Sequence, residues 1–128
     1  MPAAIRIDHD ERVIRLTLTD PLTLDEVLAF QDQQAAVGAW PFPTLADGTR
    51  CHWLPSTAEI RTVLEHLERL STRHGRRGPV ALVLPPDTAT FGLARMYSLL
   101  AEPRVGLIEA FVTMADAERW LAAVAPGQ

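Results

Sequence analysis

Cysteine and histidine are the residue types of this chain best suited to covalent chemistry, and Cys51 is followed directly by His52. A thiol becomes a nucleophile when a neighbouring base or cation favours its thiolate. Adjacent side chains on an extended segment point to opposite sides, however, and the other histidines, His9, His66 and His74, show no convergence on this pair. No Cys-x-x-Cys or His-x-x-x-His spacing occurs. We therefore expect no catalytic residue, no metal site and no cofactor, in a protein that is not an enzyme.

A serine at the start of an expected helix is the next candidate. Ser56 precedes Glu59 by three residues, which is the spacing of a capping box. A phosphate on Ser56 would meet free backbone N–H groups and the positive end of the helix dipole, and its charge would remodel a docking surface. The alternative is that Ser56 serves only as the N-cap of that helix.

Aromatic residues lie in the expected loops on either side of the third strand. Trp40, Phe42 and Trp53 have proline neighbours, and such loops line an apolar pocket or form an exposed docking patch. The alternative is that they cover the sheet edge and the first helix.

On the third expected helix, Phe91 and Arg95 are four residues apart and share one side, so Arg95 would hold an acidic group of a ligand or partner, or pair within the fold.

The basic residues gather in one segment, which contains Arg69, Arg73, His74, Arg76 and Arg77. Arginine clusters bind phosphate groups, but the chain carries a net charge of -4, and cations are also favoured at a helix C-terminus. The seven glycines form no phosphate-binding loop. We therefore expect this segment to be a solvated helix end, and no nucleic-acid partner.

Length and composition predict one domain spanning residues 1–128, with a core from about 5 to 123. A single cysteine excludes an internal disulfide and favours the cytoplasm. The longest apolar run, Val80–Leu84, is far shorter than the roughly 20 residues that cross a bilayer, so no membrane span is expected. Arginine is frequent while lysine and asparagine are absent, a bias typical of a GC-rich bacterial genome.

Hydrophobic periodicity predicts an α/β fold in the order ββαβαβαβα, with a mixed, mostly parallel five-stranded sheet and four helices. The expected strands are 5–8 and 13–19, which form a hairpin with one wet face, then 44–46, 80–84 and 105–112. The expected helices run from Thr23 to about 38, from Ser56 to about 74, from 87 or 88 to about 103, and from Thr113 onward. Thr23 with Glu26 has the capping-box spacing.

Three segments, read together with this order, resemble the STAS superfamily. They are Phe91-Gly92-Leu93-Ala94-Arg95-Met96-Tyr97, then Ala115-Asp116-Ala117-Glu118-Arg119-Trp120-Leu121, and Leu22-Thr23-Leu24-Asp25-Glu26 after the opening hairpin. The chain is most similar to the stand-alone bacterial proteins that resemble anti-sigma-factor antagonists. In better-known members a partner kinase phosphorylates a serine at the position of Ser56. The family's acidic residue before that serine is Pro55 here, and the glycine two residues after it is Ala58.

The resemblance implies a non-enzymatic STAS-like binding module, with regulatory binding of a protein partner or of a second copy in a homodimer. The surface would be the start of the second helix and the aromatic loop before it. Other members, and lipid-transfer proteins of similar architecture, hold apolar ligands. The alternative is therefore a carrier or sensor of a small apolar or amphipathic, lipid-like ligand, bound between the sheet and the third helix and entered past Phe42, Trp53 and Phe91.

Overall fold

A computed structural model describes residues 3–86, 88–101 and 105–124, in which five strands and four helices follow the order ββαβαβαβα. The strands are β1 (Ala3–Asp8), β2 (Val13–Thr19), β3 (Thr44–Arg50), β4 (Val80–Val83) and β5 (Ile108–Phe111). The helices are α1 (Leu24–Ala36), α2 (Thr57–His74), α3 (Thr88–Ala101) and α4 (Met114–Val124). The sheet order is β1-β2-β3-β4-β5, with β1 antiparallel to β2 and all other pairs parallel. The predicted α/β fold is confirmed.

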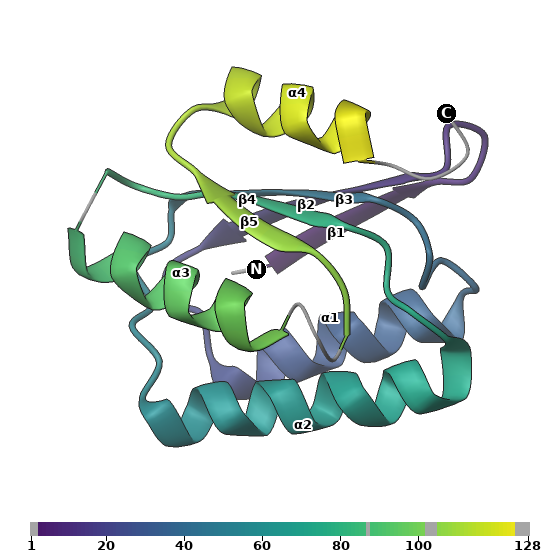
Figure 1. The fold of residues 1–128 in the computed structure, drawn as a ribbon, viewed down its shortest axis with the longest axis horizontal. Helices are drawn as coiled ribbons and strands as arrows, with labels where there is room; N and C mark the ends of the chain where they lie inside the picture. Colours follow the sequence, from purple (N-terminus) through teal and green to yellow (C-terminus); the bar gives the residue numbers. More distant parts are fainter. Residues whose placement is uncertain (1–2, 87, 102–104, 125–128) are drawn as a thin grey trace.

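Helices α1, α2 and α3 lie on one face of the sheet, and α4 lies on the other (Figure 1). From β2 to β5 each new strand is added on the same side of the last, so three right-handed connections place their helices on one common face. The chain leaves β5 without a further strand, and α4 packs back over β3, β4 and β5. The result is a sheet whose two faces have different partners.

The helix starts follow from local sequence, as predicted. Glu26 N donates to Thr23 Oγ1 at 3.3 Å, Glu59 N donates to Ser56 Oγ at 3.1 Å, and both capping boxes are complete. Asp116 N donates to Thr113 Oγ1 at 3.2 Å. Each cap satisfies a backbone donor that has no partner inside its helix. Gly75, with φ 88°, ends α2.

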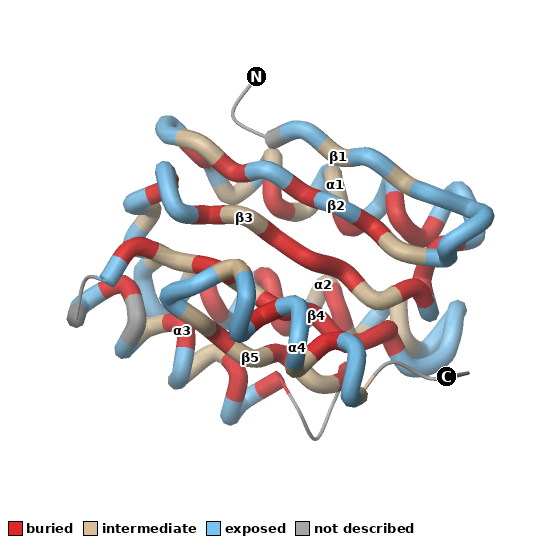
Figure 2. The backbone as a smooth tube through the Cα atoms, turned by 90° about the horizontal axis from the view of Figure 1, so that it is seen from above, coloured by how far each residue is buried: buried red, intermediate tan, exposed pale blue. Residues whose placement is uncertain are grey.

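Alternation along β2 separates the two faces of the hairpin. Leu16 and Leu18 are buried on the helix-covered face, whereas Arg15 and Thr17 are exposed. Strand β4 is buried more evenly because Val80 packs into the core on one face of the sheet, while Ala81 and Val83 pack against α4 on the other. Figure 2 shows a continuous buried run at the start of neighbouring β3, which consists of residues 44–46.

Two strands differ in length from the prediction. Strand β3 extends from the expected 44–46 to residue 50, because it pairs with β2 and β4 on its two sides. Strand β5 is shorter than the expected 105–112. The residues just before it accept hydrogen bonds from the segment that precedes β4 and from the first residue of β4. Arg77 N donates to Val105 O at 3.0 Å, and Val80 N donates to Leu107 O at 2.9 Å.

Candidate functional site

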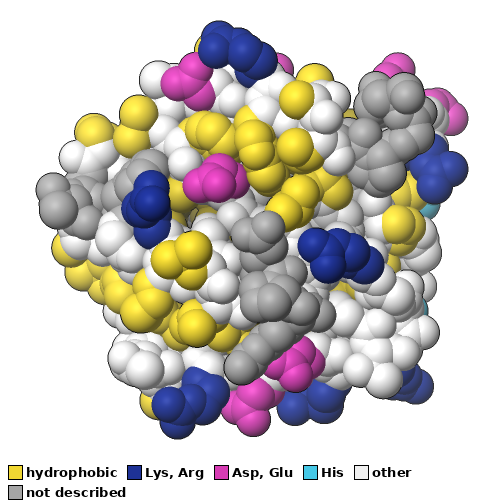
Figure 3. Space-filling view, in the orientation of Figure 1, with side chains coloured by type: hydrophobic (Ala, Val, Ile, Leu, Met, Phe, Trp, Pro, Cys, Tyr) yellow, Lys and Arg dark blue, Asp and Glu magenta, His cyan; other side chains and the backbone are white. Residues whose placement is uncertain are grey.

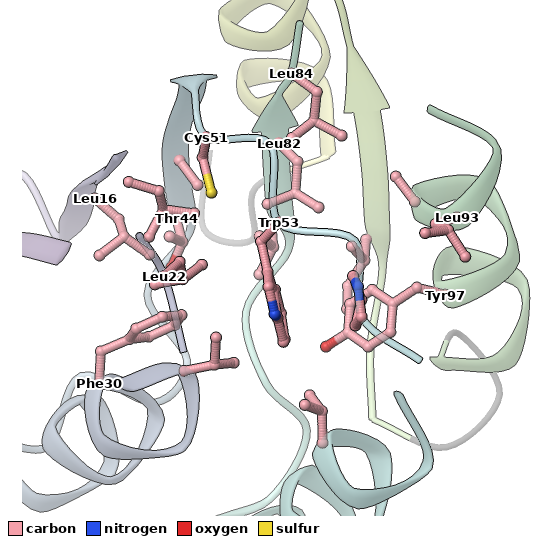
Figure 4. Close-up of a pocket in the computed structure, with 18 of the residues that line it drawn as sticks. Leu16, Leu22, Phe30, Thr44, Cys51, Trp53, Leu82, Leu84, Leu93 and Tyr97 are labelled. Carbon is pink, nitrogen blue, oxygen red and sulfur yellow. The ribbon is translucent and has the colours of Figure 1, made fainter. Parts of the chain in front are cut away.

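An apolar cavity of about 160 Å³ lies between the sheet and helices α1, α2 and α3 (Figure 4). It is about as large as an engineered cavity that stays dry and binds benzene. Strands supply its floor through Leu16, Ala46 and Leu82, and helices supply Phe30, Leu93 and Tyr97 among its walls. A space of this kind and size holds a small apolar body.

The cavity reaches close to the backbone of the sheet, because the central residue of its floor has a small side chain. Ala46 is aligned with Leu16 of β2 and Leu82 of β4, and an alanine between two leucines leaves room beneath the helices. On the opposite face of the same strands, Leu45 and Ala81 pack against α4 without lining the cavity. The cavity therefore belongs to one face of the sheet.

Loops that follow β3 and β4 close the cavity at the carboxyl ends of these strands. The half-buried Trp53 points its indole into the space, between Leu22 and Phe30 on one side and Tyr97 on the other (Figure 4). The Cys51 thiol also points inward (Figure 4). Burial raises the pKa of the Cys51 thiol above 9.0, so the group is a neutral part of the wall at physiological pH.

His52, which follows Cys51, is exposed and pairs with an acid. Its Nδ1 lies 3.0 Å from Asp20 Oδ2, and its backbone N donates to Asp20 Oδ1 at 2.9 Å. These hydrogen bonds lower the pKa of Asp20 below 3.8, with the backbone bond contributing most. His52 and Asp20 are both exposed, and no group of three metal-ligating side chains occurs in the part of the chain that the structure describes.

Arg77 lies at the amino-terminal end of the same cavity and is buried, with 6% of its surface exposed. The expectation that it belongs to a solvated helix end is wrong for this residue, because Gly75 ends α2 and the chain turns inward. The guanidinium carbon lies 5.3 Å from the centre of the Trp40 ring. Nε and Nη2 both donate to Gln34 Oε1, at 3.2 and 2.8 Å.

Main-chain contacts hold Arg77 and its partner in place. Gln34 Nε2 donates to Ala39 O at 3.1 Å and to Trp40 O at 3.2 Å, which turns Oε1 toward the guanidinium. A Cβ on Gly106 would lie 2.7 Å from Arg77 O, so only glycine permits this close approach. The charged group is thus positioned by backbone as well as by side chains.

The three aromatic residues of the expected loops differ from one another in burial and in what they contact. Trp40 and Phe42 are 1% and 6% exposed, so the expectation of an exposed patch is wrong for them. Trp40 Nε1 donates to Gly75 O at 2.8 Å, and Phe42 packs with Ile14 and Ala39. Trp53 alone of the three lines the cavity. In physical terms, the loop after α1 folds under the sheet because its aromatic rings bury more apolar area there than on the surface.

Ser56, Arg95 and Phe91 complete the set of predicted residues. Ser56 is exposed and occupied as the N-cap of α2. Arg95 is exposed on α3, with no ion pair to any described residue. Phe91 lies within α3, but its side chain falls outside the described part of the structure. The structure therefore does not join Ser56 or Arg95 to the cavity.

No family model and no curated protein matches this chain. A solved structure does match: the NMR structure of the protein TM1081 is 13% identical, with a TM-score of 0.54. The match covers 92% of this chain and 86% of that one. At this identity the likeness shows the fold alone. None of the described helices is long and apolar enough to cross a membrane.

The polar residues of the cavity were missed from sequence, although α1 carries a signal of them. Its buried stripe includes Val27 and Ala35, and the same helical spacing places Gln31 and Gln34 on that stripe. Amides at core positions indicate hydrogen bonding inside the fold. The partner of Gln34 is Arg77, which follows α2 far along the chain, whereas Gln31 Oε1 has no partner among the described residues.

Proposed function

We propose that this chain is a non-enzymatic binding domain of STAS-like architecture that holds one small, mainly apolar molecule in the cavity. The observation that carries the proposal is the apolar space of about 160 Å³. Protein interiors contain few voids larger than a water molecule, so an apolar space of this volume is unusual in a folded domain. A ligand that fills the space restores the missing contacts. The cytoplasm is the proposed location.

The ligand enters at the carboxyl ends of the strands. The wall there consists of Trp53, Leu84 and Leu93, all half-buried and close to loops. Open α/β sheets commonly bind ligands at this edge, because the loops that follow the strands vary freely. Trp53 is the side chain whose movement would open the space.

Filling the cavity by mutation tests the proposal. Ala46→Leu adds three carbon atoms to the cavity floor, and we expect the Tm to stay the same or rise, with loss of ligand. Native mass spectrometry of freshly purified wild type should show an added mass, which Ala46→Leu removes. Alkylation of Cys51 provides a second measurement, because the thiol lines the same space and a ligand shields it.

Ala81→Leu is the matched control, since Ala81 lies on the opposite face under α4. That site has no cavity, so overpacking should cost about 1–3 kcal/mol there and leave ligand binding intact. Equal destabilisation by both substitutions would contradict the cavity. Ligand-free wild type, with a Cys51 alkylation rate that small apolar molecules do not change, would contradict the function.

We propose a second function, protein binding through the start of α2, because Leu54 is 52% exposed two residues before the exposed Ser56. A second copy of the chain is the partner that is simplest to test. Ser56→Asp adds a charge while keeping a good N-cap, and Leu54→Ser removes the apolar contact. We expect both to shift a monomer–dimer equilibrium toward monomer in analytical ultracentrifugation. A wild type that stays monomeric would contradict self-association.

A further inference from the structure

A buried cation, Arg77, lies at the inner end of the cavity without an acidic partner among the described residues. Burial lowers the pKa of Arg77 below its ordinary value, but a guanidinium stays protonated inside proteins. It has five N–H donors, of which two bind Gln34 Oε1, and the described residues offer no partner for the others. Burying an ion is unfavourable unless an opposite charge accompanies it.

The contacts that Arg77 does make leave its charge uncompensated. Gln34 is neutral, and the Trp40 ring provides only the weak attraction of a π face. An apolar side chain of similar length would fill the same position without the penalty of a buried charge. The geometry therefore indicates that a negative charge approaches from the cavity, which Arg77 lines.

Other hydrogen-bonding groups of the cavity also lack partners. The Tyr97 hydroxyl points into the space (Figure 4), and no described residue binds it. Burial raises the pKa of Tyr97 to about 12, so this hydroxyl remains a donor at physiological pH. Thr44 is 1% exposed, and its Oγ1 has no hydrogen-bond partner within the described residues. In the described part of the chain, the cavity therefore has an apolar body, two free hydroxyl groups and one cation, together with one unpaired amide oxygen, Gln31 Oε1.

We propose that the molecule held in this cavity is a compact carboxylic acid, bound as its carboxylate with the head group at Arg77; this proposal rests on the proposed small-molecule function. A carboxylate accepts two parallel hydrogen bonds from a guanidinium and further bonds from hydroxyl groups. Its single negative charge matches the single positive charge, whereas a phosphate dianion would leave excess charge buried. The apolar body lies along Leu16, Ala46 and Leu82.

Three probes with one ring and different charges test the inference: benzoate, benzyl alcohol and benzylammonium. In titration calorimetry at neutral pH we expect benzoate to bind the wild type about 10- to 100-fold more tightly than benzyl alcohol. Benzylammonium should not bind. Arg77→Met should bind benzoate no more tightly than benzyl alcohol, while Arg76→Met, which removes an exposed charge from the next position, should behave as wild type.

The outcomes separate the two proposals. Benzyl alcohol binding as tightly as benzoate, or unchanged benzoate affinity in Arg77→Met, would overturn the acid inference and leave the cavity function standing. Failure of all three probes to bind would overturn both. If Arg77→Met does not fold, the affinities of the three probes for the wild type still test the inference, because the charge preference is measured without any substitution.

Figure 3 shows apolar side chains gathered over α3, where Leu99 and Leu100 are exposed. Nothing on this surface indicates what covers it, and we base no proposal on it.

Discussion

Gly78→Ala should lower the Tm by about 10 °C or more, corresponding to about 3 kcal/mol of lost stability. A Cβ at this position would lie well inside van der Waals contact with the carbonyl oxygens of Pro41 and Phe42. Both atoms belong to the backbone, so no side-chain rotation relieves the clash. Gly78 N also donates to Trp40 O at 3.0 Å, and the shift that admits a methyl group would stretch this bond.

The matched control for Gly78→Ala is Gly92→Ala. Gly92 lies within α3, and a Cβ there meets nothing within 4 Å. Because alanine favours helix over glycine, we expect a gain of about 0.5–1 kcal/mol. Thermal unfolding followed by circular dichroism measures both variants. A Gly78→Ala protein as stable as wild type would contradict the close packing of the two loops.

Trp40→Ala should cost about 3–5 kcal/mol, because the ring is fully buried and its removal leaves a large void. The substitution also removes the hydrogen bond from Nε1 to Gly75 O and the ring that lies over the Arg77 guanidinium. Chemical denaturation with urea measures the loss. If Trp40 were instead an exposed docking residue, its removal would change stability by less than about 0.5 kcal/mol.

Leu54→Ala is the control for this experiment. Leu54 is also a large apolar residue in a loop beside β3, but it is 52% exposed. We expect its truncation to stay within about 0.5 kcal/mol of wild type. Equal small effects at Leu54 and Trp40 would show that the loop after α1 does not fold under the sheet.

Both large effects concern the support of Arg77. Gly78 permits residues 77 and 78 to approach the loop after α1, and Trp40 in that loop covers the guanidinium. Substitutions at either position should therefore weaken benzoate binding as well as stability. The cavity and its charged end depend on the same close contact between two loops.

Local sequence predicted the elements well. Thr23 and Ser56 mark helix starts because a capping box involves only residues three positions apart, and it forms in any surroundings. Strand lengths were less predictable. Strand β3 continues through Asp47 and Gly48, residue types that are depleted in strands, because Asp47 pairs with both neighbouring strands and Arg50 pairs with Thr19 of β2.

The candidate site was only partly predictable. Trp53 was correctly placed beside a possible pocket, but Arg77 was assigned to a solvated helix end on the basis of its arginine neighbours. Its burial depends on Gln34, 43 positions earlier in the chain, and on the ring of Trp40. The spacing of residues within a single helix or strand does not predict a contact between residues so far apart in the chain.

The sequence by itself determined the α/β order, the helix caps and the apolar face of each strand, because these features depend on residues within a few positions of one another. Tertiary structure alone decided which polar groups share the interior. Packing three helices on one face of the sheet left a cavity above Ala46 and brought Arg77 and Tyr97 to its lining, with Gln34 bonded to the Arg77 guanidinium. Burial and charge compensation are properties of the assembled layers, so the buried, unpaired cation became visible only in the folded chain.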